Sequence, residues 1–236
     1  MPNSPAVEAL TVVSALAALS TYPYVATAIA YRRRDNGLSY ILLVLGVGIW
    51  SAMVAAQVLS TRPLVKTFFL ALSVVGALLA GLGWFLFAGT ASSTPPVPSQ
   101  RLTYGGLAVL VGLDVALAVT SPIHDLYWVA PAGAPGSAFA VVAPRIGYWL
   151  HTVLLVLLFG GGTLLFAAGW EEGTGLPYTR AYTVVGTATI IALVGSNVFA
   201  PGGLTVAPLA AVTLTTIGWV QARRGRVLGR LRAVLG

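Results

Sequence analysis

The chain has 236 residues, of which 57% are hydrophobic and only 8% are charged. Soluble domains carry about one quarter of charged residues, so this composition, with a mean hydropathy of +0.88, excludes a soluble globular protein. The sequence contains no cysteine, which excludes a disulfide framework, a thiolate metal site and a thiol nucleophile.

Seven apolar runs are long enough to cross a membrane, because a bilayer core of about 30 Å requires about 20 helical residues. In chain order they are Ala6–Tyr31, Gly37–Ser60, Pro63–Phe87, Leu102–Thr120, Ile146–Gly169, Thr179–Phe199 and Leu204–Ala222. The leading residues MPNSPAVEA lack the positive charge of a signal peptide, so we expect the first run to be retained as a helix. The sequence thus predicts an all-α polytopic protein of the cell membrane, a seven-transmembrane helix bundle.

The distribution of lysine and arginine predicts an N-terminus outside and a C-terminus inside, because both residues are enriched on the cytoplasmic side. On this assignment the cytoplasmic segments contain Arg32, Arg33, Arg34, Arg101, Arg180, Arg223, Arg224, Arg226, Arg230 and Arg232. The outer side keeps Arg62, Lys66 and Arg145. The net charge of +7 follows from this bias and from a basic tail, so no nucleic-acid partner is predicted. We expect a transmembrane domain at residues 1–222 and a basic tail, or the start of a signalling helix, at residues 223–236.

Polar side chains that are unusual in membrane helices gather in the outer halves of the spans. The set comprises Gln57, Lys66, Asp114, Arg145, His151 and Asn197. Such residues are costly in lipid and usually face the interior of a bundle, so the pattern predicts a cavity open to the outside. The alternative is that some of these side chains are interfacial anchors, namely Arg62, Lys66, Trp128, Arg145 and Trp149, and that Asp114 and Asn197 only hold helices together. Pro208 is expected about one turn into the seventh span, where it can free a carbonyl.

The two histidines, His124 and His151, lie in separate segments without metal-ligand spacing, so neither a metal site nor a cofactor is predicted. His151 is expected either to make an interhelical hydrogen bond or to sense protons, because imidazole titrates near neutrality. The run GGGT at Gly160–Thr163 lacks the spacing and the lysine of a phosphate loop. It predicts close helix packing instead.

Other classes of seven-helix and catalytic proteins are disfavoured. A covalent retinal chromophore needs a lysine in the last span, whereas Lys66 is the only lysine in the chain. A receptor coupled to G proteins is disfavoured by the absence of cysteine and by a third span that ends in WFLFAG. With six acidic residues and two histidines, the sequence contains no catalytic constellation, and we expect no enzymatic activity in this chain.

The order of four motifs resembles the N-terminal seven-transmembrane sensor region of histidine kinases, over essentially the whole chain. The motifs are SPIHDLYW after the fourth span, YWLHTVLLVLL in the fifth, GSN in the sixth and LTVAPLAAVTLTTIGWV in the seventh. The residues that match the family pattern are Pro122, His124, Trp128, Trp149, His151, Asn197, Thr205 and Pro208. Three positions depart from it: Ser121 replaces an asparagine, Ser196 separates Gly195 from Asn197, and Gly203 or Leu204 stands where an acidic residue is common.

The resemblance implies a module that detects an extracytoplasmic or intramembrane stimulus and passes it through the seventh helix to a cytoplasmic output such as a histidine kinase. The candidate ligand-binding residues are Asp114, His124, Trp128, Arg145, Trp149, His151, Asn197 and Thr205. The expected partners are the lipid bilayer, a small ligand of unknown identity and the kinase or other output, and a homodimer is left open. Two alternatives are a small transporter or channel, which needs polar groups through the full membrane depth, and a scaffold that only assembles with membrane proteins.

The sequence after the last span, ARRGRVLGRLRAVLG, contains neither a phosphoacceptor histidine nor a nucleotide-binding module. It is therefore compatible with an excised sensor and with a stand-alone protein. Its arginines alternate with valine and leucine at near-helical spacing, which predicts either an amphipathic helix on anionic lipid or a continuation of the seventh helix.

Overall fold

A computed structural model shows an almost entirely helical protein. It describes residues 5–30, 37–91, 100–129, 139–171, 179–201, 205 and 207–220. The long helices are α1 (Pro5–Ala30), α2 (Gly37–Leu59), α3 (Pro63–Ala91), α4 (Gln100–Val119), α6 (Ile146–Glu171) and α7 (Thr179–Phe199). A shorter apolar helix follows at Ala207–Val220 and is called the seventh helix below. The short elements are α5 (Ser121–His124), β1 (Trp128–Val129) and β2 (Ala143–Pro144).

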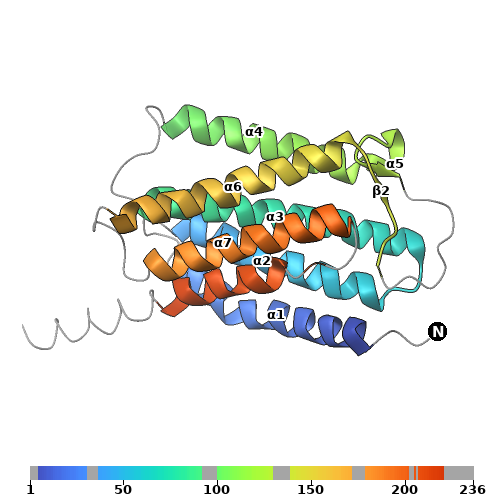
Figure 1. Ribbon diagram of the computed structural model, residues 1–236, viewed down its shortest axis with the longest axis horizontal. Helices are drawn as coiled ribbons and strands as arrows, with labels where there is room; N and C mark the ends of the chain where they lie inside the picture. The colour runs from blue at the N-terminus through green and yellow to red at the C-terminus, as the bar shows by residue number, and fades with distance from the viewer. Residues whose placement is uncertain are drawn as a thin grey trace, which may run out of the picture.

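The long helices lie side by side in one bundle, with α4 and α1 on opposite sides and α2, α3, α6 and α7 between them (Figure 1). Within the described residues, six helices are long and apolar enough to cross a membrane. They confirm the first six predicted spans to within a few residues at each end. The elements α5 and β2 and the first turn of α1 lie at one end of the bundle (Figure 1). This is the end that the arginine distribution places outside, and it is called the outer end below.

The seventh helix differs from the prediction in one respect. Pro208 was expected about one turn into the span, but it is the second residue of the described helix, which begins at Ala207. In the first turn the missing N–H of proline has no intrahelical partner to lose. Pro208 therefore starts this helix rather than freeing a carbonyl within it.

Glycines bring α2 and α3 into close contact. A Cβ added to Gly46 of α2 would lie 2.2 Å from the backbone nitrogen of Ala80, and one added to Gly83 of α3 would lie 2.2 Å from that of Leu43. Small residues allow helix backbones to approach in this way in membranes, where packing rather than the hydrophobic effect holds helices together. These two helices therefore form a tightly packed pair in the bundle.

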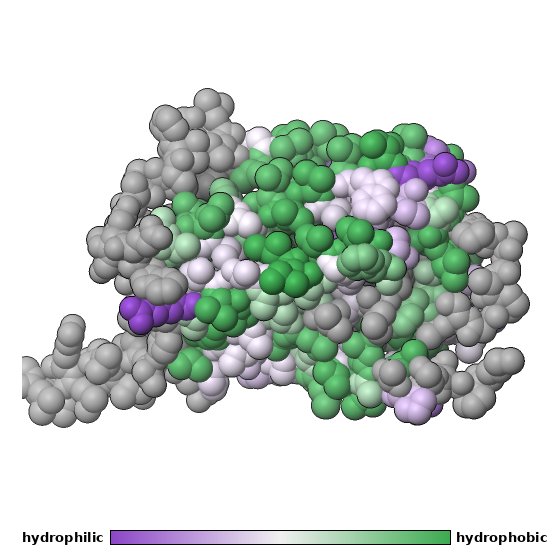
Figure 2. Space-filling model, viewed as in Figure 1, coloured by the Kyte–Doolittle hydropathy of each residue, from purple (hydrophilic) through white to green (hydrophobic). Residues whose placement is uncertain are grey.

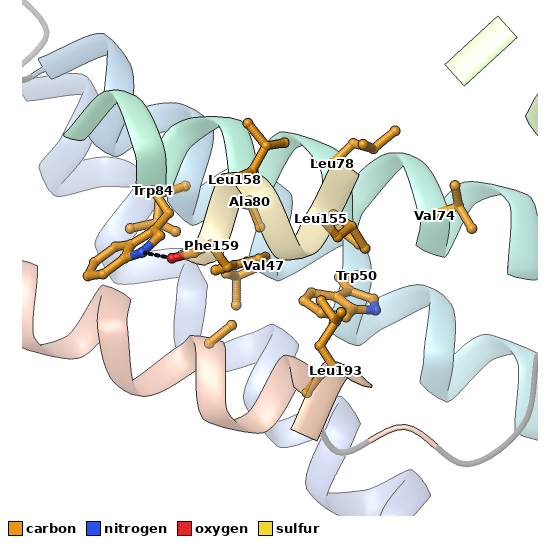
Figure 3. Close-up of a cluster of buried hydrophobic side chains, with 14 of the residues drawn as sticks. Val47, Trp50, Val74, Leu78, Ala80, Trp84, Leu155, Leu158, Phe159 and Leu193 are labelled. Atoms are coloured by element: carbon orange, nitrogen blue, oxygen red, sulfur yellow. Dashed lines mark hydrogen bonds between the residues drawn. The ribbon is translucent and has the colours of Figure 1, made fainter. Parts of the chain in front are cut away.

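The predicted close packing of GGGT is confirmed where α6 crosses α3. A Cβ on Gly162 would lie 2.7 Å from the ring of Trp84, which is fully buried. The Nε1 of Trp84 donates a hydrogen bond to the carbonyl of Phe159 at 3.1 Å, in the core shown in Figure 3. Thr163 is a second acceptor for the same N–H, at 3.3 Å. The indole is thus satisfied inside an apolar core, as a buried tryptophan requires.

The outside of the bundle is apolar along its length. Large side chains such as Leu110, Leu157 and Ile191 are exposed, and Figure 2 shows hydrophobic residues over the side of the bundle and strongly hydrophilic ones near its ends. In water a surface of this kind would be an aggregation hazard. It is the surface expected of helices that face lipid.

Candidate functional site

The segment SPIHDLYW forms a tight turn at the outer end. Ser121 holds the turn closed, because its Oγ lies 3.2 Å from the carbonyl oxygen of Trp128 and accepts a hydrogen bond from the backbone N–H of Trp128 at 3.3 Å. Asp125 ends α5 in the left-handed conformation, with φ of 52°. His124 is bonded within the same turn: its Nδ1 accepts from the N–H of Leu126 at 3.0 Å, and its Nε2 lies 2.9 Å from Thr120 Oγ1. The hydrogen bonds of His124 thus shape this turn.

Tyr127 and Trp128 are buried at the outer end of the bundle. Tyr127 is fully buried and Trp128 is 3% exposed, so the reading of Trp128 as an interfacial anchor is wrong. The turn is attached to the start of α6, because the N–H of Gly147 donates to Leu126 and that of Arg145 donates to Tyr127, each at 3.0 Å. A Cβ at Gly147 would lie 2.8 Å from the Tyr127 ring, and the glycine therefore allows the ring to pack there.

Asp114 of α4 and His151 of α6 form a buried pair beneath Tyr127. The Nδ1 of His151 lies 2.7 Å from Oδ2 of Asp114, and both residues are buried. The hydroxyl of Tyr127 donates to the same carboxylate oxygen at 3.4 Å. Burial raises the pKa of Tyr127, and the neighbouring Asp114 raises it further, so this hydroxyl remains a proton donor at neutral pH.

A cavity of about 40 Å³ lies next to His151 at the outer end. Its walls come from α2, α3, α6 and α7 and from residue 205, which precedes the seventh helix. The apolar part of the lining comprises Trp50, Val54, Leu70, Val74, Ala77, Leu155 and Ala200. The polar part comprises Gln57, Ser73, Tyr148, His151, Ser196, Asn197 and Thr205. The lining is thus half apolar and half polar, and it combines an apolar wall with convergent polar groups, as ligand sites do.

Hydrogen bonds connect the polar lining from α6 through α7 to Thr205, which precedes the seventh helix. Asn197 donates from Nδ2 to Thr152 Oγ1 at 3.2 Å, which joins α7 to α6. Tyr148 joins the same two helices, because its hydroxyl donates to the carbonyl of Asn197 at 3.4 Å. Next to Asn197 in the chain, Ser196 accepts a hydrogen bond from the hydroxyl of Thr205 at 3.2 Å. The lining thus ends two residues before the seventh helix begins.

The structure places three of the predicted site residues, His151, Asn197 and Thr205, in the cavity lining. Asp114 lies behind His151 as its hydrogen-bond partner. The other four lie outside the lining: His124 and Trp128 in the turn, and Arg145 and Trp149 with exposed side chains at the start of α6. A ligand role for these four stays a prediction.

Sequence reasoning missed several residues of the lining. Ser73 and Trp50 carried no signal, because one serine or tryptophan in an apolar run has no pattern of its own. For Lys66 the sequence left open an interfacial anchor or a position that faces the interior, and the residue is buried. Its position offered a clue, since Leu70, Ser73 and Ala77 follow at helical spacing on the same face of α3 and line the cavity.

The fold and the cavity define a class: a multi-pass membrane protein of seven helices, with a small polar-lined cavity at its outer end. The family model described as the N-terminal 7TM region of histidine kinase matches residues 10–225, and the chain belongs to this family. No match is found among curated proteins. The chain is thus a membrane sensor region of the kind associated with histidine kinases, as the four motifs predicted.

Proposed function

We propose that the chain senses a stimulus in the outer cavity and passes it through the seventh helix to a cytoplasmic output such as a histidine kinase. One observation carries this proposal. The cavity lining includes Thr205, which bonds to Ser196 and stands two residues before the helix at Ala207–Val220. A change in the cavity therefore acts on the start of the helix that leads toward the basic tail.

The seventh helix is also held along its length by α1 and α2. The Tyr40 hydroxyl donates to the main-chain carbonyl of Thr215 at 2.8 Å, and the Tyr24 hydroxyl lies 3.1 Å from Thr216 Oγ1. Gly218 allows the first contact, because a Cβ there would lie 2.6 Å from the ring of Tyr40. The helix is thus attached to the cavity at one end and to two neighbouring helices near the other.

A stimulus shifts such a helix only if it interacts differently with two arrangements of the bundle. The hydrogen bond between Thr205 and Ser196 is a neutral one, and such bonds between membrane helices contribute about 0.6 kcal/mol on average. A cavity occupant that competes for Ser196 can therefore change this contact at small cost. We assign residues 1–222 to the sensor and residues 223–236 to the connection with the output; residues 221–236 lie outside the described residues.

The alternative of a transporter or channel has less support. Such a protein needs polar groups or broken helices near the midplane. Here the polar lining lies in the outer half of the bundle, although the cavity reaches inward to Ala77 at the middle of α3. The residues that follow toward the inner side are Trp84, Leu158 and Phe159 of the apolar core. In addition, α1 runs through Pro23 as one helix.

Filling the cavity tests the proposed function without knowledge of the stimulus. Ala77 is buried and lines the cavity, so Ala77→Leu places three more carbon atoms where an occupant would lie. The matched control is Gly112→Leu, because a Cβ at Gly112 has no neighbour within 4 Å. Each variant is joined in frame, after Gly236, to a histidine kinase output domain and assayed in membrane vesicles for autophosphorylation.

We expect Ala77→Leu to change autophosphorylation several-fold and Gly112→Leu to leave it unchanged. A second variant that fills the cavity, Ser73→Leu, shows whether the effect comes from the filled cavity or from misfolding caused by a single substitution. Monodisperse elution in detergent verifies the fold of each variant. Equal activity in folded forms of all the variants would reject the cavity as the sensing site. Uptake of solutes into liposomes that contain the chain alone would favour the transporter instead.

A further inference from the structure

His151 stands between a carboxylate and the cavity. Its Nδ1 lies 2.7 Å from Oδ2 of Asp114, while the same ring lines the cavity wall. The side chain is only 3% exposed. Among the described residues, a change in the surroundings therefore reaches this ring through the cavity. Since Asp114 holds Nδ1, the nitrogen that can meet such an occupant is Nε2.

The hydrogen bonds of Asp114 determine whether Nε2 of His151 is a proton donor or a proton acceptor. The hydroxyl of Tyr127 donates to the carboxylate oxygen that His151 also contacts. A carboxylate that accepts two hydrogen bonds stays an acceptor, and the proton of a neutral His151 ring is then carried by Nδ1. In that tautomer Nε2 has a lone pair and is a proton acceptor directed away from Asp114.

The size of the cavity restricts the stimulus. A site for a small organic ligand usually has about 300–1,000 Å³, whereas this cavity has about 40 Å³. A water molecule needs about 10–15 Å³ on the same scale, so the space holds about three waters. Gln57, Ser73 and Ser196 supply the polar partners that ordered water requires. A short cluster of water molecules carries a proton to a neighbouring side chain readily. A proton is therefore the ligand that suits this cavity best.

We propose that the stimulus read in this cavity is proton uptake by His151, which makes the chain a sensor of pH on the outer side. This inference rests on the proposed function and names its ligand. In the step a hydronium ion of the cavity water loses one O–H bond, Nε2 forms an N–H bond, and a neutral water remains. Nε2 thereby changes from a hydrogen-bond acceptor to a donor.

The groups around His151 include one whose charge stabilises the protonated ring. The titratable neighbours are Asp114 of α4, Tyr127 of the turn and Tyr148 of α6, and the α3 face that lines the cavity carries Lys66 one turn outward of Leu70. The polar lining that α2 and α7 contribute is uncharged: Gln57, Ser196 and Asn197. Asp114 is thus the neighbouring group whose negative charge stabilises an imidazolium.

A route from the new N–H to the seventh helix is present in the lining. Asn197 uses Nδ2 to bind Thr152, which leaves Oδ1 as an acceptor for a donating imidazolium. Ser196 precedes Asn197 and holds Thr205. A shift of Asn197 toward His151 therefore acts on the contact that precedes the seventh helix.

The test uses the fact that the chain has two histidines. In the His124→Gln variant His151 is the only one, so NMR of ¹⁵N-labelled histidine in lipid bilayers reports its protonation alone. If that variant is unstable, a difference spectrum between the unsubstituted chain and His151→Gln gives the same signal. We expect a reversible change at His151 within about pH 5–8. In an Asp114→Asn background we expect a smaller protonated fraction of His151 at a given pH, because the imidazolium loses its counter-charge.

Constant protonation of His151 over that range overturns the inference, as does a protonated fraction that Asp114→Asn leaves unchanged. Autophosphorylation of the kinase fusion separates this failure from failure of the proposed function. If Ala77→Leu changes the output while outer pH does not, the cavity is the sensing site and the proton is not its ligand. A pH-dependent output that His151→Gln abolishes and Gly112→Leu retains supports the inference.

Discussion

His151 and Asp114 are 37 residues apart in the chain, and their side chains meet in a hydrogen bond of 2.7 Å between Nδ1 and Oδ2. The bond joins α6 to α4, which lies on one side of the bundle (Figure 1). A charge-assisted hydrogen bond contributes about 1.5–3 kcal/mol. Removal of one partner leaves the other buried without its bond, and this costs more than removing both.

The first prediction concerns this pair. We expect His151→Leu and Asp114→Leu each to lower the free energy of unfolding, and the double variant to lose less than the sum. The coupling energy should be about 1.5–3 kcal/mol, measured by denaturation in mixed micelles. Purely additive losses would show that the two side chains do not interact.

The second prediction concerns the contact between α2 and α3. In Gly46→Leu the new side chain has to displace the backbone of α3 near Ala80. Overpacking of this kind costs about 1–3 kcal/mol or more. Thermal unfolding in detergent should therefore occur at a lower temperature than in the unsubstituted chain. Gly112→Leu, which adds the same atoms to open space, should unfold like the unsubstituted chain; equal losses in both variants would contradict the packing.

The third prediction concerns the hydrogen bond from Tyr40 to the seventh helix. Tyr40→Phe removes the donor to the carbonyl of Thr215 and keeps the ring. We expect a loss of about 1 kcal/mol in the free energy of unfolding and a higher basal kinase output, because the helix is less restrained. Tyr22→Phe is the control, since Tyr22 is 79% exposed. An unchanged stability in Tyr40→Phe would argue against the bond.

The fourth prediction concerns alkaline pH and Tyr127. Its pKa is raised above the ordinary value of 10.0 by burial and by Asp114, so above pH 10 the unfolded chain releases this proton while the folded chain keeps it. The contribution of Tyr127 to stability is complete below pH 10 and falls as pH rises further, by about 1.4 kcal/mol per pH unit for one proton. Tyr127→Phe should lose stability less steeply above pH 10. Equal slopes in the two proteins would show that the hydroxyl is not buried as described.

The helices could be read from the sequence because uninterrupted apolar runs have a length that only a bilayer requires. The depth of a polar residue also followed from its place in a run, which is why Gln57, His151 and Asn197 were expected in the outer half and lie in the lining. Thr205 also lies in the lining, but it was expected only from the family resemblance. Which side of a helix faces inward did not follow. Trp149 and His151 are two residues apart, yet Trp149 is 37% exposed and His151 is buried.

The partners of the buried groups were beyond sequence reasoning for a physical reason. The contact of Tyr127 with Asp114 depends on the tight turn that Ser121 closes, and no periodicity reports such a turn. The same holds for Lys66, whose place at the membrane surface left open an interfacial anchor or an inward position, and which is buried. Contacts across the bundle depend on the rotation of each helix, which apolar runs of high uniform hydropathy leave undetermined.

The central claim is that the state of the outer cavity sets the position of the seventh helix, and an intramolecular distance tests it most directly. Because the chain has no cysteine, spin labels at Leu38→Cys and Val220→Cys report one distance, between the inner ends of α2 and the seventh helix, by electron paramagnetic resonance in lipid bilayers. Leu38 is 66% exposed and tolerates a label. We predict that Ala77→Leu shifts this distance distribution and that Gly112→Leu does not. Identical distributions in the three proteins would contradict the account.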